Sequence, residues 1–375
     1  MKRKKLRLFN RIVFIINLMV ILALLLSYSS LWISPLAFWP LAFFGLIYPL
    51  IFFVNLVFIG YWLFVSRFHM LFSLVAILSG IGLTGRYVQV NDKTPSEELS
   101  SFHKVMTYNV HSYARREWKD NDDTSLQQTF LQLFRNEKPD ILCLQEHLAY
   151  GETERKIREN LRAETDMQYY YLKKYLNTHN KSQCIGLFSR YPIIKYGMEQ
   201  MDWQGKERTY FIFGDIAFPE DTIRVYSVHL QSNYLNKESM LFSEIPDFEN
   251  KEYNNQVKTN TISLIRKLRN AFKGRAKQSR ILRKHIKASP HPVVVCGDFN
   301  DTPVSYAYHQ IKGKMNDAYK TSGSGASSTY EGKFPASRID YIFHDAEIQS
   351  ANTRVIEKNY SDHYPVVTYL KLKDE

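Results

Sequence analysis

The sequence contains no acidic residue before Asp92, although eight of its 49 Lys and Arg residues lie in that stretch. From Asp92 on, the other 41 basic residues nearly balance all 37 acidic ones, so this part carries only +4 of the formal net charge of +12. The basic character is therefore concentrated in the N-terminal region. This distribution excludes a chain that is basic throughout, as a general nucleic-acid binder would be.

Cysteine is scarce, with Cys143, Cys184 and Cys296 as the only three residues of this type. The number is odd and two of the three lie in apolar runs, which favours buried thiols over a disulfide framework. No Cys/His spacing of a zinc site is present. Internal repeats are also absent, which excludes a solenoid.

Charged side chains are missing from residues 12–66 and, after Arg67, from residues 68–85. A bilayer requires about twenty consecutive apolar residues in a helix. The first run is too long for one helix. A turn within it is favoured by Ser29, Ser30, Pro35 and Pro40. Within an anchor of residues 1–90 we therefore predict three membrane-spanning helices, at about 12–30, 40–64 and 68–85. A cleaved signal peptide is disfavoured, because its apolar region would end after about 15 residues.

The orientation of this anchor follows from its loops. A cluster of Lys and Arg between Lys2 and Arg11 precedes the first helix, and Arg67 separates the second from the third. The turn from Trp32 to Trp39 is uncharged, so the positive-inside rule places the N-terminus in the cytoplasm. Three spans then place everything after Arg86 outside it, on the periplasmic side of a bacterial inner membrane. A re-entrant middle segment would reverse this placement.

A polar linker, about 91–102, leads into residues 103–375, where β-branched and aromatic runs of strand length recur. We expect strands at 104–112, 140–147, 185–193, 210–218, 222–231, 292–300 and 338–344. Apolar residues at helical spacing predict helices at 125–136 and 255–287. The pattern predicts an α/β (α+β) domain in which two packed sheets are flanked by helices.

Most of these strands end in a polar side chain that could take part in chemistry. The residues are Asn109, Glu146, His229, Asp298, Asn300 and Asp340, and Asp362 and His363 lie near the C-terminus. Packed sheets gather such strand ends at a common edge, where clustered carboxylates need a cation. Oxygen ligands from Glu146 and Asp362, with the amide of Asn109, suit Mg²⁺ or Mn²⁺. An ion with few protein ligands keeps open positions for phosphate and water, so the sequence predicts phosphoester hydrolysis.

Seven ordered motifs carry a resemblance to a known family. They are "TYNVHS", "LQEH", "GLFSRYPI", "SVHLQ", "CGDFND", "RIDYIF" and "SDHYPV". In this order they are similar to those of the endonuclease/exonuclease/phosphatase family, which includes deoxyribonucleases, abasic-site endonucleases, neutral sphingomyelinases and inositol polyphosphate 5-phosphatases. The resemblance covers about residues 103–372. It implies a four-layered α/β sandwich and metal-dependent cleavage of phosphoesters, with Glu146, Asp362 and Asn109 at the metal.

The resemblance also implies roles for five further residues. His363 resembles the general base or phosphate-binding imidazole of the family, and Asp340 would fix its tautomer and raise its pKa. Asp298 would position or deprotonate the attacking water, and Asn300 would donate to a phosphate oxygen. His229 resembles the second histidine of the deoxyribonuclease and sphingomyelinase branches, which protonates the leaving group or binds phosphate.

Some positions depart from the family pattern. Abasic-site endonucleases carry an acidic residue where this chain has His111, and a tyrosine near the position of His229, so DNA repair is disfavoured. Arg208 could contact a phosphate, although a solvated turn arginine is the simpler interpretation. We interpret His111 as a bystander and His147 as structural.

A basic insertion, at about 233–290, separates two of the motifs. Residues 251–290 hold 12 Lys and Arg against Glu252 alone. As a helix this segment is amphipathic, and it could be a solvated face, a groove for a polyanionic substrate or a contact with anionic lipid headgroups.

The sequence therefore favours a phosphoesterase held in the lipid bilayer by its N-terminal helices, with a lipid headgroup, a nucleotide or nucleic acid as substrate. An extracytoplasmic nuclease is the alternative among enzymes. An inactive module that binds a phosphorylated ligand is the alternative from another class. The complete set of residues from Asn109 to His363 argues against this module, because binding alone requires no base and no carboxylate that orients it.

Overall fold

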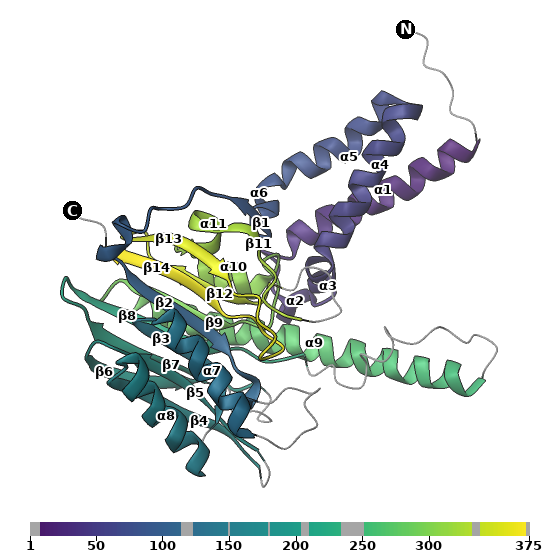
Figure 1. Cartoon of the computed structure of the whole chain (residues 1–375). Helices are drawn as coiled ribbons and strands as arrows, with labels where there is room; N and C mark the ends of the chain where they lie inside the picture. The colour runs from purple at the N-terminus through teal and green to yellow at the C-terminus, as the bar shows by residue number, and fades with distance from the viewer. Residues whose placement is uncertain are drawn as a thin grey trace.

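The computed structural model describes residues 8–113, 123–148, 151–178, 181–203, 210–233, 251–331 and 338–372. A bundle of apolar helices at the N-terminus projects from a larger α/β domain (Figure 1). The polypeptide crosses from one part to the other after the last bundle helix.

Six helices form the N-terminal bundle. They are α1 (Leu8–Ser29), α2 (Pro35–Phe38), α3 (Leu41–Leu46), α4 (Tyr48–Val65), α5 (Arg67–Ser79) and α6 (Ile81–Thr84). The helices α1 and α4, of 22 and 18 residues, are long and apolar enough to cross a membrane, whereas α5 has 13 residues. The expected helix at 40–64 is divided at Ile47, because Pro49 in the first turn of α4 favours a new helix start. The expected helix at 68–85 is divided at Gly80, which packs against the ring of Tyr28.

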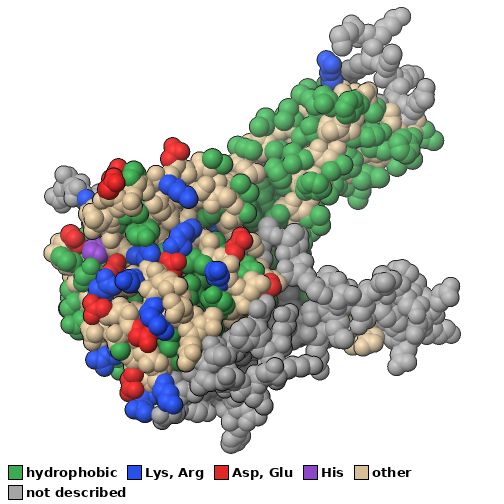
Figure 2. Space-filling model, in the orientation of Figure 1, with side chains coloured by type: hydrophobic (Ala, Val, Ile, Leu, Met, Phe, Trp, Pro, Cys, Tyr) green, Lys and Arg blue, Asp and Glu red, His purple; other side chains and the backbone are tan. Residues whose placement is uncertain are grey.

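The bundle buries a few polar side chains within a mainly hydrophobic interior, and its outer surface is apolar as well. Asn17 is fully buried, donates to the hydroxyl of Ser73 (2.7 Å) and accepts from the indole of Trp62 (2.9 Å). The amide of Asn55 is also buried and donates to the carbonyl oxygen of Ile51. Hydrophobic side chains cover the surface of α1, α4 and α5 (Figure 2). A water-soluble helix bundle would instead expose polar and charged side chains on this surface.

Two six-stranded mixed sheets make up the α/β domain. The first has the order β13-β14-β2-β3-β5-β4 and the second β10-β12-β9-β8-β7-β6. The strands of the first sheet are β2 (His103–Asn109), β3 (Ile141–Leu148), β4 (Tyr169–Thr178), β5 (Lys181–Ser189), β13 (Ile348–Val355) and β14 (Val366–Leu372). Those of the second are β6 (Ile193–Gln200), β7 (Tyr210–Ala217), β8 (Thr222–His229), β9 (Val293–Asp298), β10 (Asn316–Asp317) and β12 (Asp340–His344). A short pair, β1 (Val88–Val90) and β11 (Ser324–Ala326), lies where the bundle meets the domain.

Helices cover the outer faces of both sheets. The remaining helical elements are η1 (Glu98–Ser101), η2 (His111–Tyr113), α7 (Asp123–Glu137), α8 (Gly151–Thr165), α9 (Lys251–Lys287), α10 (Tyr306–Lys312) and α11 (Ala318–Ser322). Phe134 of α7 and Leu161 of α8 pack on the first sheet, whereas Leu282 of α9 and Ile311 of α10 pack on the second. A third cluster, which includes Val105 and Val294, fills the space between the sheets. The four-layered α/β sandwich is confirmed, and all three cysteines are buried and free.

A loop of the domain, Asp301–Val304, is held inside the N-terminal bundle. The hydroxyl of Ser30 donates to the carbonyl oxygen of Val304 (3.1 Å). The hydroxyl of Thr302 donates to the carbonyl oxygen of Gly45 (3.2 Å). The side chain of Val304 is fully buried among bundle residues. The bundle and the domain therefore share a packed core at this loop, which directly follows β9 and Asn300.

Replacing Gly45 with alanine should loosen this contact. A Cβ atom on Gly45 would lie 2.2 Å from the carbonyl oxygen of Val304, so either the loop or α3 must move. We expect the free energy of unfolding to fall by about 1–3 kcal/mol, as is usual for overpacking. Thermal unfolding of the full chain in detergent measures this change. Gly60→Ala in α4 is the control, because a Cβ there meets nothing within 4 Å; equal melting temperatures for the two variants would contradict the prediction.

Candidate active site

The predicted polar residues meet at one edge of the two sheets. Because β2 and β3 are parallel, as are β8 and β9, their carboxyl ends carry Asn109, Glu146, His229 and Asp298 to this edge. Asp340, the first residue of the antiparallel strand β12, lies opposite Asp298 in the register. Buried strands that end in polar residues thus bring those polar side chains together at one edge.

Gly297 allows β9 and β8 of the second sheet to approach each other at the site. Its φ is +147°, and a Cβ on it would lie 2.0 Å from the carbonyl oxygen of Val228 in β8. Only glycine permits the two strands to approach this closely. The residue that follows, Asp298, is thereby placed beside His229, whose Nε2 lies 3.6 Å from Asp298 Oδ2.

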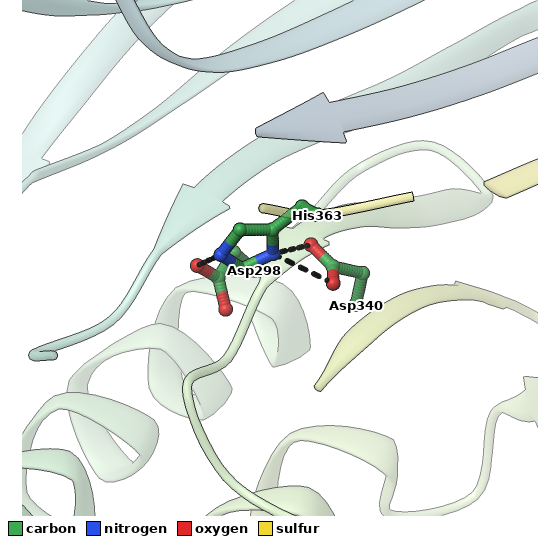
Figure 3. Close-up of side chains that lie close together, drawn as sticks. All are labelled: Asp298, Asp340 and His363. Carbon is green, nitrogen blue, oxygen red and sulfur yellow. Dashed lines mark hydrogen bonds and ion pairs between the residues drawn. The ribbon is translucent and has the colours of Figure 1, made fainter. Parts of the chain in front are cut away.

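His363 lies between two buried carboxylates (Figure 3). Its Nδ1 is 3.0 Å from Asp340 Oδ2, and its Nε2 is 3.7 Å from Asp298 Oδ2. The ring of Tyr330 packs edge-on against the imidazole at 5.0 Å between centroids. The imidazole is consequently held in one orientation, with Nδ1 engaged by Asp340 and Nε2 facing the site.

The two carboxylates also control the charge of this histidine. Burial opposes the protonated imidazole, but the negative charges of Asp340 and Asp298 outweigh it and raise the pKa of His363 to about 10. Burial raises the pKa of Asp340 to about 6, against the attraction of His363. At neutral pH and without a bound cation, Asp340 and His363 therefore form an ion pair.

Asn109 joins the two sheets at the site. Its amide nitrogen lies 3.0 Å from Asp298 Oδ2, 3.3 Å from Glu146 Oε1 and 3.5 Å from His363 Nε2. The amide oxygen accepts from the backbone N–H of His111 (3.0 Å). A single buried amide thus fixes the spacing between β2, β3, β9 and the segment before β14.

Glu146 is directed to the edge by an irregularity in β3. The pairing of β3 with β5 shifts register between Leu144 and His147, and Glu146 has a φ of +51°. Such a bulge re-aims a side chain, and positive φ in a non-glycine residue is strain that often marks a functional site. The Glu146 carboxylate accepts from Gln183 Nε2 (2.9 Å) and lies 3.7 Å from His229 Nε2.

His111 belongs to this cluster, which corrects its interpretation as a bystander. Its Nδ1 is 3.5 Å from Glu146 Oε2 and 3.7 Å from Asp362 Oδ1. Burial of Glu146 opposes its ionisation, but the hydrogen bond from His111 and the nearby imidazole of His229 lower the pKa of Glu146 well below its usual range. The positive φ of His111 was the structural sign of its role, and it cannot be read from the sequence.

The remaining predicted residues have mixed outcomes. Asn300 is at the site, with a φ of +52°, but its amide donates to the carbonyl oxygen of Leu230 (3.0 Å) and to Asp298 (3.1 Å), so contact with a phosphate stays a prediction. Arg208 lies outside the described residues. His147 is fully buried and contacts the hydroxyl of Tyr113 at 2.6 Å, in line with a structural role. Gln183 was missed, because it precedes the apolar part of its strand.

Two groups of side chains could hold a cation. The donor atoms of Asp298, Asp340 and His363 all lie within 4.8 Å of one another, but each already engages another member of the group. The carboxylates of Glu146 and Asp362 both lie near Nδ1 of His111, and both are only partly buried. Carboxylate oxygens with access to solvent fit a hard divalent ion that keeps some of its waters. The residues present therefore fit a divalent cation.

Two mixed sheets in a four-layered sandwich thus carry carboxylates and imidazoles at their shared edge. The chain belongs to the endonuclease/exonuclease/phosphatase family, which matches residues 106–363. Members of this family hydrolyse phosphoester bonds and typically depend on a divalent metal ion. Residues 10–87 match a separate domain family of unknown function.

Solved structures with the same fold share little sequence with this chain. An endonuclease/exonuclease/phosphatase from Beutenbergia cavernae is 18% identical over 72% of each chain, with a TM-score of 0.52. A family protein from Leptotrichia buccalis is 17% identical over 72% of this chain and 100% of its own, with a TM-score of 0.50. The catalytic domain of human Nocturnin, which holds a sulfate anion, is 16% identical over 73% and 94%, with a TM-score of 0.50. None of the curated proteins matches the sequence.

Proposed function

We propose that this protein is a membrane-anchored, divalent-metal-dependent phosphoesterase that hydrolyses a P–O ester by means of an activated water. The observation that carries the proposal is the chain of contacts Asp340–His363–Asp298, at the same sheet edge as Glu146. A structural ion pair would not require a second carboxylate on the free nitrogen of the imidazole. Phosphoester hydrolysis needs a group that accepts the proton of the attacking water, a carboxylate that orients the histidine, and acidic ligands for a metal ion.

Glu146 and Asp362, with Asn109 beside them, would hold Mg²⁺ or Mn²⁺. When bound, the ion supplies positive charge that stabilises the non-bridging oxygens of the phosphate. The hydrogen bond from Gln183 orients the Glu146 carboxylate toward this position. Support from such an outer partner is typical of metal ligands.

The other residues would bind and move protons. Asp340 fixes the ring of His363, whose Nε2 faces the place of the scissile phosphate, and Asp298 orients the attacking water or accepts its proton. His229, with Nε2 3.7 Å from Glu146, is placed to donate a proton to the leaving oxygen. Asn300 would contact a phosphate oxygen after releasing Asp298 or Leu230.

The bundle supports anchoring in a membrane and a particular sidedness. Its lipid-compatible surface and inward-facing Asn17 and Asn55 suit a bilayer. The helices α1, α4 and α5 lie side by side, and α1 begins at the end of the bundle far from the α/β domain (Figure 1). With the basic N-terminal cluster in the cytoplasm, the α/β domain would lie outside it, in the periplasm of a bacterial cell. The third pass would be made by α5 extended by α6.

Hydrolysis of bis-para-nitrophenyl phosphate by the full chain in detergent tests the proposed activity. We expect activity with Mg²⁺ or Mn²⁺, loss in EDTA and recovery when the ion is restored. Silence of a folded wild-type protein with either ion would favour the phosphate-binding module. A panel of plasmid DNA, sphingomyelin and phosphoinositide would then separate the nuclease from enzymes that act on lipid headgroups.

A further inference from the structure

The long helix α9 has two halves with different surroundings. From Leu268 onward its apolar side chains are buried: Phe272 packs against Phe43 of the anchor, and Leu282 and Ile286 pack on the second sheet. The half before Leu268 projects beyond the domain (Figure 1). A projecting helix with a polar surface would need no explanation, but this one exposes two large aliphatic side chains, Ile262 at 49% and Ile265 at 42%.

The exposed isoleucines lie on one face together with basic residues. Lys258, Ile262, Ile265, Arg266 and Arg269 follow one another at steps of one, three or four residues, so they form one stripe along the helix. All five are exposed. From Val257 to Lys287 the sequence contains eleven Lys and Arg and no acidic residue. The stripe is therefore apolar at its centre and strongly basic around it.

This stripe begins where the helix contacts the membrane anchor. The guanidinium of Arg269 lies 5.7 Å from the ring centre of Trp39, between α2 and α3. One turn further on, Phe272 packs edge-on against Phe43 at 5.3 Å. The anchor also exposes Phe38 (55%), which precedes Trp39, and Trp32 (69%), whose ring contacts His309 of α10 in the domain. Aromatic residues at the end of a membrane helix mark the level of the lipid headgroups.

We infer that the projecting half of α9, residues 256–267, lies on the membrane surface, with Ile262 and Ile265 inserted among the headgroups of an anionic bilayer and Lys258 and Arg266 at the phosphates. The stripe shares its helix face with Arg269, which contacts the anchor, so it faces the side on which the bilayer must lie. Apolar residues flanked by Lys and Arg are the composition of interfacial helices, and each basic residue near an anionic surface adds attraction. The inference rests on the membrane anchoring proposed above.

Nucleic acid would satisfy the basic residues but not the isoleucines. A polyanion groove contacts phosphates through Lys and Arg and bases through aromatic side chains, whereas Ile262 and Ile265 offer neither charge nor a ring. A lipid surface uses both components of the stripe. It would also hold α9, and with it Arg275, which ion-pairs with Asp301 beside the active edge (3.0 Å), at a fixed height above the bilayer.

The test uses single cysteines that carry an environment-sensitive nitrobenzoxadiazole fluorophore, in the full chain reconstituted in nanodiscs. Ile262→Cys and Ile265→Cys report the stripe, and Gln256→Cys is the control, because it precedes Ile265 by nine residues and so lies on the opposite side of the helix. Leu22→Cys in α1 reports the anchor itself. The three native cysteines are buried, and labelled wild-type protein gives the background.

In phosphatidylglycerol nanodiscs we expect labels at 262 and 265 to shift their emission to the blue. Nitroxides at a shallow depth in the lipid should quench these labels more than deep nitroxides. The quenching should be weaker in phosphatidylcholine nanodiscs, and the control label at 256 should not be quenched. The label at 22 should show the reverse depth order. Quenching at 22 but not at 262 and 265 overturns the inference and leaves the anchoring standing. No quenching at 22 overturns the anchoring, and the inference with it. A response at 262 and 265 to an added oligonucleotide but not to lipid overturns the inference in favour of nucleic acid.

Discussion

Alanine in place of His363 should lower the rate of bis-para-nitrophenyl phosphate hydrolysis by about 10²–10⁴-fold, the usual contribution of a positioned acid or base. The substitution removes the only imidazole that lies between Asp340 and Asp298 in the described residues. It also leaves two buried carboxylates without the positive charge that separates them. The measurement is kcat at saturating Mg²⁺, with the melting temperature recorded for each protein.

Two further variants separate this effect from general damage. His291→Ala removes a histidine that is remote from the site and lies 3.8 Å from Asp215, and it should leave kcat unchanged. Asp340→Asn keeps the shape of the orienting residue but not its charge, and it should lose less activity than His363→Ala. A folded His363→Ala protein with wild-type kcat would refute the proposed role of His363.

Glutamine in place of Glu146 should raise the Mg²⁺ concentration that gives half-maximal activity by at least about 100-fold. Even the outer partners of metal ligands are worth ~10–100-fold in affinity or activity, and this change removes the charge of a direct ligand. The carboxamide fits the same space, so the bulge in β3 and the hydrogen bond from Gln183 can remain. The titration is followed by activity and, independently, by calorimetry with Mn²⁺.

The matched control for this variant is Glu159→Gln. Glu159 is exposed on α8 and pairs with Arg155 one turn away, so its loss should leave the metal requirement as it is. If Glu146→Gln required no more metal than the wild type, the cation would have to be sought at Asp298, Asp340 and His363. The two outcomes therefore distinguish the two groups of donors.

The central strands could be predicted from the sequence because they are buried on both faces. Both β9 and β7 begin with a continuous apolar run, at 293–296 and 210–213, which is the pattern of a strand covered by a sheet on one side and a helix on the other. The edge strands β4 and β6 were missed, because they mix apolar and charged residues without a regular alternation and expose side chains such as Tyr169, Ile194 and Lys195. The helix α8 was also missed, because Ile157 and Leu161 are its only fully buried aliphatic side chains among charged neighbours. Val366–Leu372 did carry a strand pattern, and the prediction overlooked it.

The candidate site could be anticipated because its members end strands. Asn109, His229 and Asp298 are each the last residue of a buried strand, so a common edge was enough to bring them together. The role of His111 was hidden, because it depends on backbone torsions that turn the chain back toward Glu146. The contact between Gly45 and Val304 was equally hidden. It joins two segments by shape alone, without a charge or a motif that would have marked either one.

The burial of Asp301–Val304 in the bundle means that the anchor is more than a tether. A protease that cut the chain after Val90 would expose the apolar side chain of Val304 and deprive its carbonyl group, and that of Pro303, of donors from Ser30 and Arg86. The freed segment begins next to Asn300, so disorder there would spread to the catalytic edge. We therefore expect separation of the α/β domain from the bundle to abolish the proposed hydrolysis, so that this activity would require the intact N-terminal helices.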